Sequence, residues 1–288
     1  MKYPLVLMFI LGSLAVWGQD DLLAELDALS PTQSKSFVFA TFKGTRIINQ
    51  QSVELPAEKE GQFVIGHRFG SLNDRPLYNL FGLDVANIRF EYSYSPFPWL
   101  NLGAGRSSGA KTYDTFTKVR LVRQSSGTGF NWPVTIAYYT NATIVTTPFS
   151  DGQKHFFTDR MAYSHQLLIA RKWNETVSFQ IAPTLVHFNL VPFAAEANDQ
   201  WGLSIAGRYK LNRRMALTGE TLLRHDPFSR YHNAASVGID IETGGHVFQF
   251  HVTNARSMAD PQWMMQTPSV WSKGEIYLGF NITRVFNH

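Results

Sequence analysis

The stretch ASVGIDIETGGHVFQFHVT, residues 235–253, has the pattern of a β-hairpin with two opposed faces. Successive side chains alternate across a strand, so valine and isoleucine share one face of the first arm, opposite serine, aspartate and glutamate. In the second arm, phenylalanine and valine alternate with glutamine, histidine and threonine. Gly244 and Gly245 lie between the arms and tolerate the positive φ that a tight reversal needs. Each arm has about ten residues, enough for a tilted strand to cross a bilayer, so the stretch predicts two transmembrane β-barrel strands.

The same two-residue alternation recurs along most of the chain. Together with the hairpin it predicts an all-β fold: a single closed antiparallel transmembrane β-barrel of about 12 strands, of the outer-membrane type, over residues 61–288. The other predicted strands cover residues 62–68, 87–94, 100–104, 115–123, 134–144, 160–171, 177–189, 201–210, 215–222 and 275–286.

The predicted connections alternate in length. Short ones follow residues 94, 123, 171, 211 and 242, and longer ones follow residues 68, 106, 144, 189, 222 and 253. Short periplasmic turns and longer outer loops are typical of bacterial barrels, which predicts that both chain ends are periplasmic. A soluble β-sandwich requires neither this alternation nor strands of this length.

The beginning of the chain differs from the barrel region. Residues 1–18 have one early lysine, an apolar run and small residues near the end, which predicts a secretory signal peptide cleaved between Gly18 and Gln19. The alternative, a retained membrane anchor, is disfavoured because the apolar run is shorter than about 20 residues. Residues 19–60 are expected to form a periplasmic leader that opens with an acidic, leucine-containing stretch. Within it, residues 36–55 lack alternation and are expected to pair with the barrel or fold into its mouth.

The composition restricts the function classes. The chain has no cysteine, which excludes disulfides, thiolate metal sites and a lipid-anchor cysteine. The net charge of +4 comes from scattered residues, so no nucleic-acid partner is expected. The aromatic content of 14% fits a barrel with aromatic girdles in contact with outer-membrane lipid.

Several motifs resemble one family. They are TFKGTRIINQQSVE, GHRFG, NLFGLDVANIR, GAGRS, SHQLLIARK, APTLVH, GRYKL, DIETGGHVFQFH and GFNITRVF. Over about residues 42–286 the chain resembles the membrane-bound β-barrel family of Bacteroidota known as domain of unknown function 5777. The resemblance implies an outer-membrane barrel without an assigned activity, and it supplies no catalytic motif that transfers to this chain.

Alternation also assigns charged side chains of both signs to the lumen face. One hypothesis is that these charges pair in a closed interior, which gives a structural or partner-binding barrel. The alternative is a narrow passive channel for small solutes, with the charges lining water. The predicted lumen-facing residues are Arg89, Glu91, Lys118, Arg120, Arg160, Arg208, Glu220, Asp240 and Glu242.

An enzyme is not expected. A remote alternative, an outer-membrane phospholipase-like enzyme, would use a serine and a histidine close together. Ser164 and His165 are consecutive, so on a strand they point to opposite faces. His246 and His251 are likewise on opposite faces, which is wrong for shared metal ligation. The chain has no cofactor motif, so no catalytic, cofactor or metal residue is assigned.

Phe286 ends the last predicted strand and is expected to be recognised by the barrel-assembly machinery, or to serve as a girdle aromatic at the interface. Deleting residues 286–288 is therefore expected to reduce insertion into the outer membrane, measured by cell fractionation and by heat-modifiable migration on gels. Unaltered insertion would leave only the girdle role.

Overall fold

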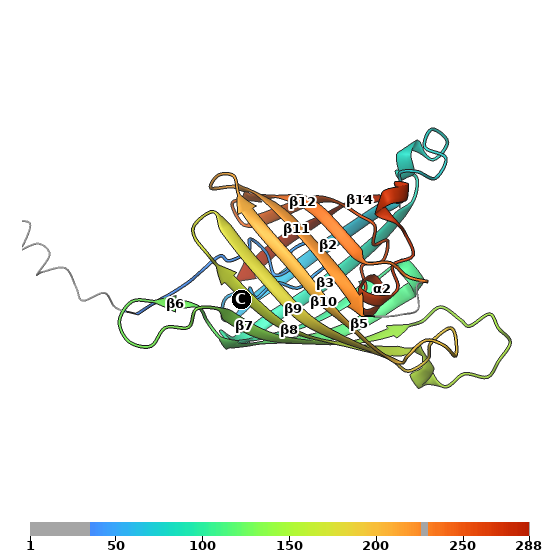
Figure 1. Ribbon diagram of the computed structural model, residues 1–288, viewed down its shortest axis with the longest axis horizontal. Coiled ribbons are helices and arrows are strands. Elements are labelled where there is room, and N and C mark those ends of the chain that lie inside the picture. The colour runs from blue at the N-terminus through green and yellow to red at the C-terminus, as the bar shows by residue number, and fades with distance from the viewer. Residues whose placement is uncertain (1–34, 226–229, 288) are drawn as a thin grey trace, which may run out of the picture.

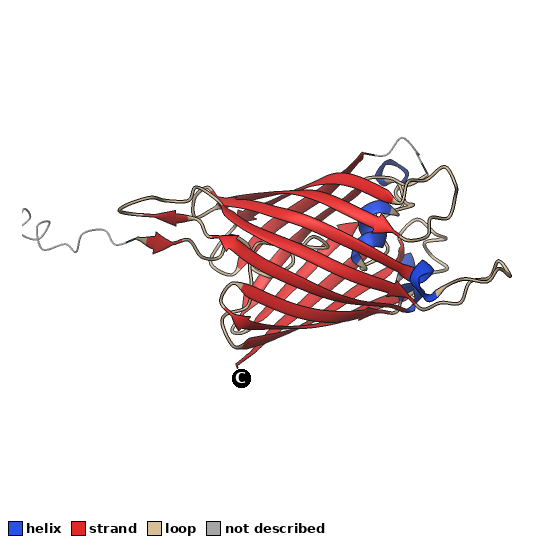
Figure 2. Cartoon of the chain, turned by 90° about the horizontal axis from the view of Figure 1, so that it is seen from below, coloured by secondary structure: helices blue, strands red, loops and turns tan. Residues whose placement is uncertain are grey.

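The computed structural model describes residues 35–225 and 230–287, and its main feature is a closed barrel of twelve antiparallel strands (Figures 1 and 2). The signal peptide expected at residues 1–18 lies outside the described residues. Strand β14 pairs with β2 and closes the ring, which confirms the predicted fold class. The barrel strands are β2 (Glu60–Ser71), β3 (Ala86–Phe97), β4 (Leu100–Ser107), β5 (Thr112–Val122), β7 (Thr135–Val145), β8 (Met161–Lys172), β9 (Val177–Phe188), β10 (Asp199–Lys210), β11 (Met215–His225), β12 (Ala234–Thr243), β13 (His246–Thr253) and β14 (Tyr277–Asn287).

The two ends of the barrel differ. One end, called here the turn end, holds the start of β2 and the end of β14, together with the tight turns at residues 98–99 and 244–245. The opposite end, called the loop end, holds the long connections and the short helices. No helix among the described residues is long and apolar enough to span a membrane. The helices are η1 (Leu80–Gly82), η2 (Gly109–Lys111), η3 (Phe157–Arg160), α2 (Asp260–Met265) and η4 (Trp271–Lys273).

Two connections contradict the predicted alternation of loop lengths. At the loop end, β4 and β5 are joined by residues 108–111 alone. At the turn end, residues 123–134 form a long excursion that contains β6 (Ser125–Ser126). Its strand β6 pairs with β1 (Ser36–Phe37) in a separate two-stranded sheet outside the barrel wall. The Nε of Arg123 also donates to the carbonyl of Val38 at 2.9 Å and ties the excursion to the start of the described chain.

The β12–β13 hairpin has the predicted faces. Val237 pairs with Val252 and is 54% exposed on the outside, whereas Asp240 pairs with Gln249 and both are buried inside. The reversal uses positive φ at Gly244 and Gly245, 27° and 103°. Large exposed aromatics lie near both ends of the outer surface, as in the girdles of membrane barrels. They include Phe97, Trp99, Trp173 and Tyr209 near the turn end, and Tyr113 and Trp201 near the loop end.

Small residues on the inner face leave space inside the barrel. Ala137, Ala182 and Ala206 point inward and are almost completely buried. Gly103 faces the ring of Phe116, and a Cβ atom on Gly103 would lie 2.2 Å from that ring. The space beside these alanines is filled by side chains of residues 42–53, a segment that is not part of the barrel wall.

Replacing Gly103 with alanine is expected to destabilise the barrel by about 1–3 kcal/mol, because the ring of Phe116 has to move. Urea unfolding in lipid vesicles, followed by tryptophan fluorescence, measures the change. Gly219→Ala is the matched control, since its Cβ would approach no atom closer than 3.8 Å. Equal unfolding midpoints for the two variants would contradict the expected clash.

Candidate functional site: the plugged lumen

Residues 41–54, called here the N-terminal plug, fold as a hairpin inside the barrel. The chain passes from β1 into the lumen and returns to the turn end before β2 begins (Figure 1). The amide of Ile47 donates to the carbonyl of Gln50 at 2.8 Å, and the amide of Ser52 donates to the carbonyl of Thr45 at 2.9 Å. These bonds close a tight tip at residues 47–50, whose side chains are all buried.

The tip of the N-terminal plug is held by the carboxylate of Glu220, which points inward from β11. It accepts hydrogen bonds from three consecutive backbone amides, those of residues 48, 49 and 50, at 3.1, 2.8 and 3.0 Å. Unpaired buried amides and an unpaired buried carboxylate are both costly, so this arrangement satisfies both at once.

The base of the same plug is held by Lys118, which points inward from β5. Its ammonium donates to the backbone carbonyls of Thr45, Ser52 and Glu54 at 3.0, 3.0 and 3.1 Å. A wall cation therefore satisfies plug carbonyls, just as the wall anion satisfies plug amides.

Amide side chains of the wall complete the contacts with the plug backbone. Gln180 accepts from the amide of Val53 at 3.0 Å and donates to the carbonyl of Gln51 at 2.7 Å. Gln249 donates to the carbonyl of Ile47 at 2.7 Å. Asn281 donates to the carbonyl of Ile48 at 3.0 Å. The plug is thus bound mainly through its main chain.

A second segment enters from the loop end. Residues 255–269, called here the loop-end plug, include α2 and pack Trp263, Met264 and Met265 into the barrel at 0–2% exposure. The wall residues Leu222 and Phe188 belong to the same apolar cluster. The loop-end plug therefore fills the opposite half of the lumen.

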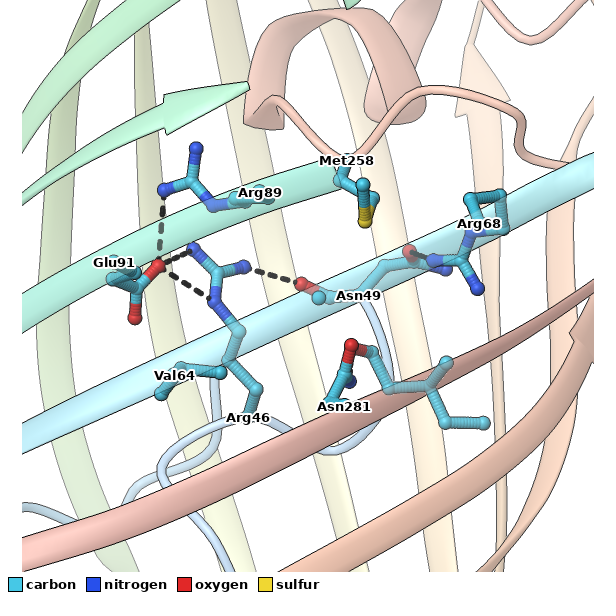
Figure 3. Close-up of a pocket in the computed structure, with 10 residues that line it drawn as sticks. Arg46, Asn49, Val64, Arg68, Arg89, Glu91, Met258 and Asn281 are labelled. Atoms are coloured by element: carbon cyan, nitrogen blue, oxygen red, sulfur yellow. Dashed lines mark hydrogen bonds and ion pairs between the residues drawn. The ribbon is translucent and has the colours of Figure 1, made fainter. Parts of the chain in front are cut away.

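The two plugs meet at an ion pair between Arg46 and Asp260. The guanidinium of Arg46 lies 3.2 Å from Asp260 and 2.7 Å from the wall residue Glu91. Figure 3 shows Arg46 reaching Glu91 on one side and the carbonyl of Asn49 on the other. Burial lowers the pKa of Arg46, but the carboxylates of Glu91 and Asp260 outweigh it and hold this pKa well above its ordinary value. Arg46 is therefore a permanently charged link between the two plugs.

Further groups extend this buried network. Arg89 donates to Glu91 at 2.9 Å and to Asp114 at 2.8 Å. Asp260 accepts from the hydroxyl of Tyr139 and, at 3.0 Å, from the indole of Trp263. The charges at the junction are consequently paired within the network.

A small cavity remains beside the junction. It has a volume of about 20 Å³, and Gly66 is among its lining residues. Figure 3 shows Arg46, Arg68, Arg89 and Met258 around it. The cavity is open here because Gly66 has no side chain: a Cβ would lie 3.0 Å from the sulfur of Met258. A space of that size holds about one water molecule. It is a packing gap between plug and wall.

Six of the nine predicted lumen residues point inward and are no more than 7% exposed. Most of them bind the N-terminal plug or its flanks. Arg208 donates to the carbonyl of Ala40 at 2.8 Å, whereas Asp240 accepts from the wall residue Gln249 at 3.2 Å. The six are Arg89, Glu91, Lys118, Arg208, Glu220 and Asp240.

The other three predicted residues lie at the ends of the barrel. At the turn end, Arg120 donates to the carbonyl of Pro98 at 3.3 Å, and the exposed Glu242 forms an ion pair with Lys43 of the plug. Arg160 was expected on the lumen wall, and this is wrong. It ends η3, before β8 begins, and donates to the carbonyl of Thr147 at 2.6 Å within the loop-end connection.

The alternation pattern does not identify Arg46, Asp114 or Asp260 as lumen residues. Arg46 lies in a stretch without alternation, and Asp260 lies inside a long connection, so neither belongs to a predicted strand. Asp114 precedes the predicted start of its strand by one residue, so a more generous boundary would have included it.

Within the part of the chain that the structure describes, the residues considered for a phospholipase-like site and for metal ligation do not come together. Ser164 is fully buried on the inner face, whereas His165 is on the outer face, where its Nδ1 lies 2.8 Å from the hydroxyl of Tyr138. His251 is buried inside and His246 is on the opposite face of β13. No cluster of three potential metal ligands occurs among the described residues.

Comparisons with known proteins agree with this fold. A family model described as a membrane bound beta barrel domain, domain of unknown function 5777, matches residues 42–286. No curated protein matches the sequence. Among solved structures, the NanC porin is similar at a TM-score of 0.50 and 8% identity, over 79% of this chain and 99% of that chain. The KdgM porin in complex with disordered oligogalacturonate has a TM-score of 0.49 and 9% identity over the same shares. The NanC similarity concerns the fold alone.

Glu220→Gln is expected to loosen the N-terminal plug, because one carboxamide group cannot accept from all three amides without placing its own N–H against a donor. Loss of charge-assisted hydrogen bonds of this kind corresponds to about a tenfold or larger rise in the open population. A single cysteine at Gln50 reports this through its rate of maleimide labelling, since the chain has no other cysteine.

Gln50→Cys suits this purpose because the Gln50 side chain has no hydrogen-bond partner among the described residues. Glu196→Gln is the matched control, a buried carboxylate at the loop end whose oxygens have no partner in the described structure. If Glu220→Gln labels no faster than this control, the carboxylate does not retain the plug.

Proposed function

The chain belongs to the membrane-bound β-barrel family of domain of unknown function 5777, and we propose that it is a closed, non-enzymatic barrel of the bacterial outer membrane. In this proposal the barrel serves as a structural or partner-binding component and does not act as an open pore. The observation that carries the proposal is the meeting of two inserted segments at the Arg46–Asp260 ion pair.

The energetics of the lumen favour the closed state. Lys118 and Glu220 are 0% and 7% exposed, and their hydrogen-bond partners are main-chain groups of the plug. If the plug withdrew and no water entered the space it left, both charges would be buried without a partner, which costs several kcal/mol for each ion. The plug therefore belongs to the stable structure and is more than a loosely held lid.

The proposed orientation follows from the asymmetry of the two ends. Outer-membrane barrels place short turns in the periplasm and long loops outside the cell. The turn end holds the base of the N-terminal plug and the end of β14, so both chain termini are assigned to the periplasm. The strand β14, with Phe286 near its end, is then available to the barrel-assembly machinery, and the apolar outer belt contacts outer-membrane lipid.

A second candidate is a narrow passive channel that opens when the plug withdraws. The observation that favours it is the connectivity, since both arms of the N-terminal plug leave the barrel at the turn end and can withdraw without threading. The exposed wall would then present carboxamide groups, which suit small polar solutes. These include Gln166, Gln180, Gln249 and Asn281.

Single-channel recording on the refolded protein separates the two candidates. The wild type is expected to be silent across voltages. Replacing residues 41–54 by a glycine–serine linker leaves the loop-end plug in place. The closed barrel then predicts silence until residues 255–269 are replaced as well, whereas a channel that opens when the N-terminal plug withdraws predicts steady conductance from the single replacement.

Heat-modifiable migration on gels is the control that each variant forms a barrel. Steady conductance of the wild type would overturn the closed barrel in favour of the passive channel. Silence of a folded double variant would show that the plugs are not what closes the lumen.

A further inference from the structure

A polar pocket lies at the loop end, on the outer side of the loop-end plug. Its volume is about 560 Å³, within the range of roughly 300–1,000 Å³ typical of small-molecule sites. Its walls come from four parts of the chain: the start of β3 at Asn87, the 108–112 stretch, Tyr231 in the β11–β12 connection, and the loop-end plug. The pocket is thus built by several elements, and it shares no lining residue with the small cavity beside the Arg46–Asp260 junction.

The wall next to η2 is fixed by its own hydrogen bonds. The Asn87 side chain accepts from the hydroxyl of Ser108 at 2.9 Å and from the amide of Gly109 at 2.9 Å. Its Nδ2 donates to the carbonyl of Arg256 at 3.3 Å and joins this wall to the loop-end plug. The pocket therefore has a defined shape before any ligand binds.

The lining groups have a specific chemistry. Gln262 and Gln266 bring two carboxamides, and Tyr231 brings an aromatic ring. The Oε1 of Gln262 is buried and has no hydrogen-bond partner among the described residues. Among residues 35–225 and 230–287, the exposed Arg256 forms no ion pair, and none of the residues that line the pocket has a carboxylate.

We infer that this pocket binds a carbohydrate, and that it binds a sugar with a carboxylate more tightly than a neutral one. A carboxamide donates and accepts at the same time, which matches the paired hydroxyls of a sugar ring. The ring of Tyr231 provides an amphipathic surface for the C–H face of a sugar. Arg256 supplies the fork geometry that matches a carboxylate.

This inference deepens the proposed function, because it gives the barrel a ligand class at the end assigned to the outside. It rests on that proposal only for the orientation. Binding to the pocket does not require the lumen to conduct, so the two are tested by separate measurements.

The test is saturation-transfer NMR on the full refolded chain in detergent, with glucose and glucuronate as probes at millimolar concentration. Both sugars are expected to receive saturation, and glucuronate is expected to bind more tightly. Gln262→Ala is expected to abolish transfer to both probes. Arg256→Gln is expected to weaken glucuronate binding about tenfold and to leave glucose binding unchanged, because only the charged partner is lost.

Matched controls are Gln153→Ala and Arg75→Gln, the same kinds of change in exposed loop-end connections away from the pocket. Gel migration checks that each variant folds, and Gln266→Ala is a second pocket variant should Gln262→Ala fail to do so. No transfer to either sugar, or transfer unaffected by the pocket variants, would overturn the site. Equal binding of glucose and glucuronate would overturn the charge preference. Conductance recordings report on closure independently of all these outcomes.

Discussion

The interior of this barrel depends on one requirement: main-chain groups taken into the lumen must find hydrogen-bond partners there. A hairpin inserted into a barrel has no neighbouring strand along most of its length, so its amides and carbonyls cannot be satisfied by a sheet ladder. Glu220 serves three amides and Lys118 serves three carbonyls, and each is also a charge that would be costly to bury alone. The presence of both signs on the lumen face follows from this, since a peptide backbone needs acceptors and donors in similar number.

Around these polar contacts the lumen is packed like the core of a soluble protein. Phe42, Ile47 and Val53 of the N-terminal plug join a cluster with inward-facing wall residues such as Leu168. The loop-end plug forms a second cluster around Trp263. Burial of such side chains contributes about 1.5–3 kcal/mol each, so the apolar contacts supply much of the driving force for insertion. The hydrogen bonds fix the position of the plug, and alanines on the inner wall provide the room for it.

The wall of the barrel can be predicted from local sequence patterns, whereas the plugs cannot, and the reason is physical. Alternation is a local property, so the β12–β13 hairpin and the ring of strands were predictable from short windows. The contact between Ile48 and Asn281 joins residues 233 positions apart, and no local pattern encodes it. Arg160 was misassigned because strand ends are not marked by alternation. The excursion at residues 123–134 was taken for a turn because its turn-rich composition does not reveal that β6 pairs with β1.

The junction of Arg46 and Asp260 joins segments that enter from opposite ends of the barrel, and this has a thermodynamic consequence. A shared ion pair couples the free energies of the two insertions, and such a coupling is reciprocal: withdrawal of either segment weakens the retention of the other by the same coupling free energy. Helix α2 carries Asp260 toward the junction and, two residues later, Gln262 toward the pocket at the loop end. A change at the loop-end pocket is therefore connected through α2 and the Arg46–Asp260 ion pair to the N-terminal plug. The two ends of the barrel are linked by side chains inside the lumen rather than through the strands of the wall alone.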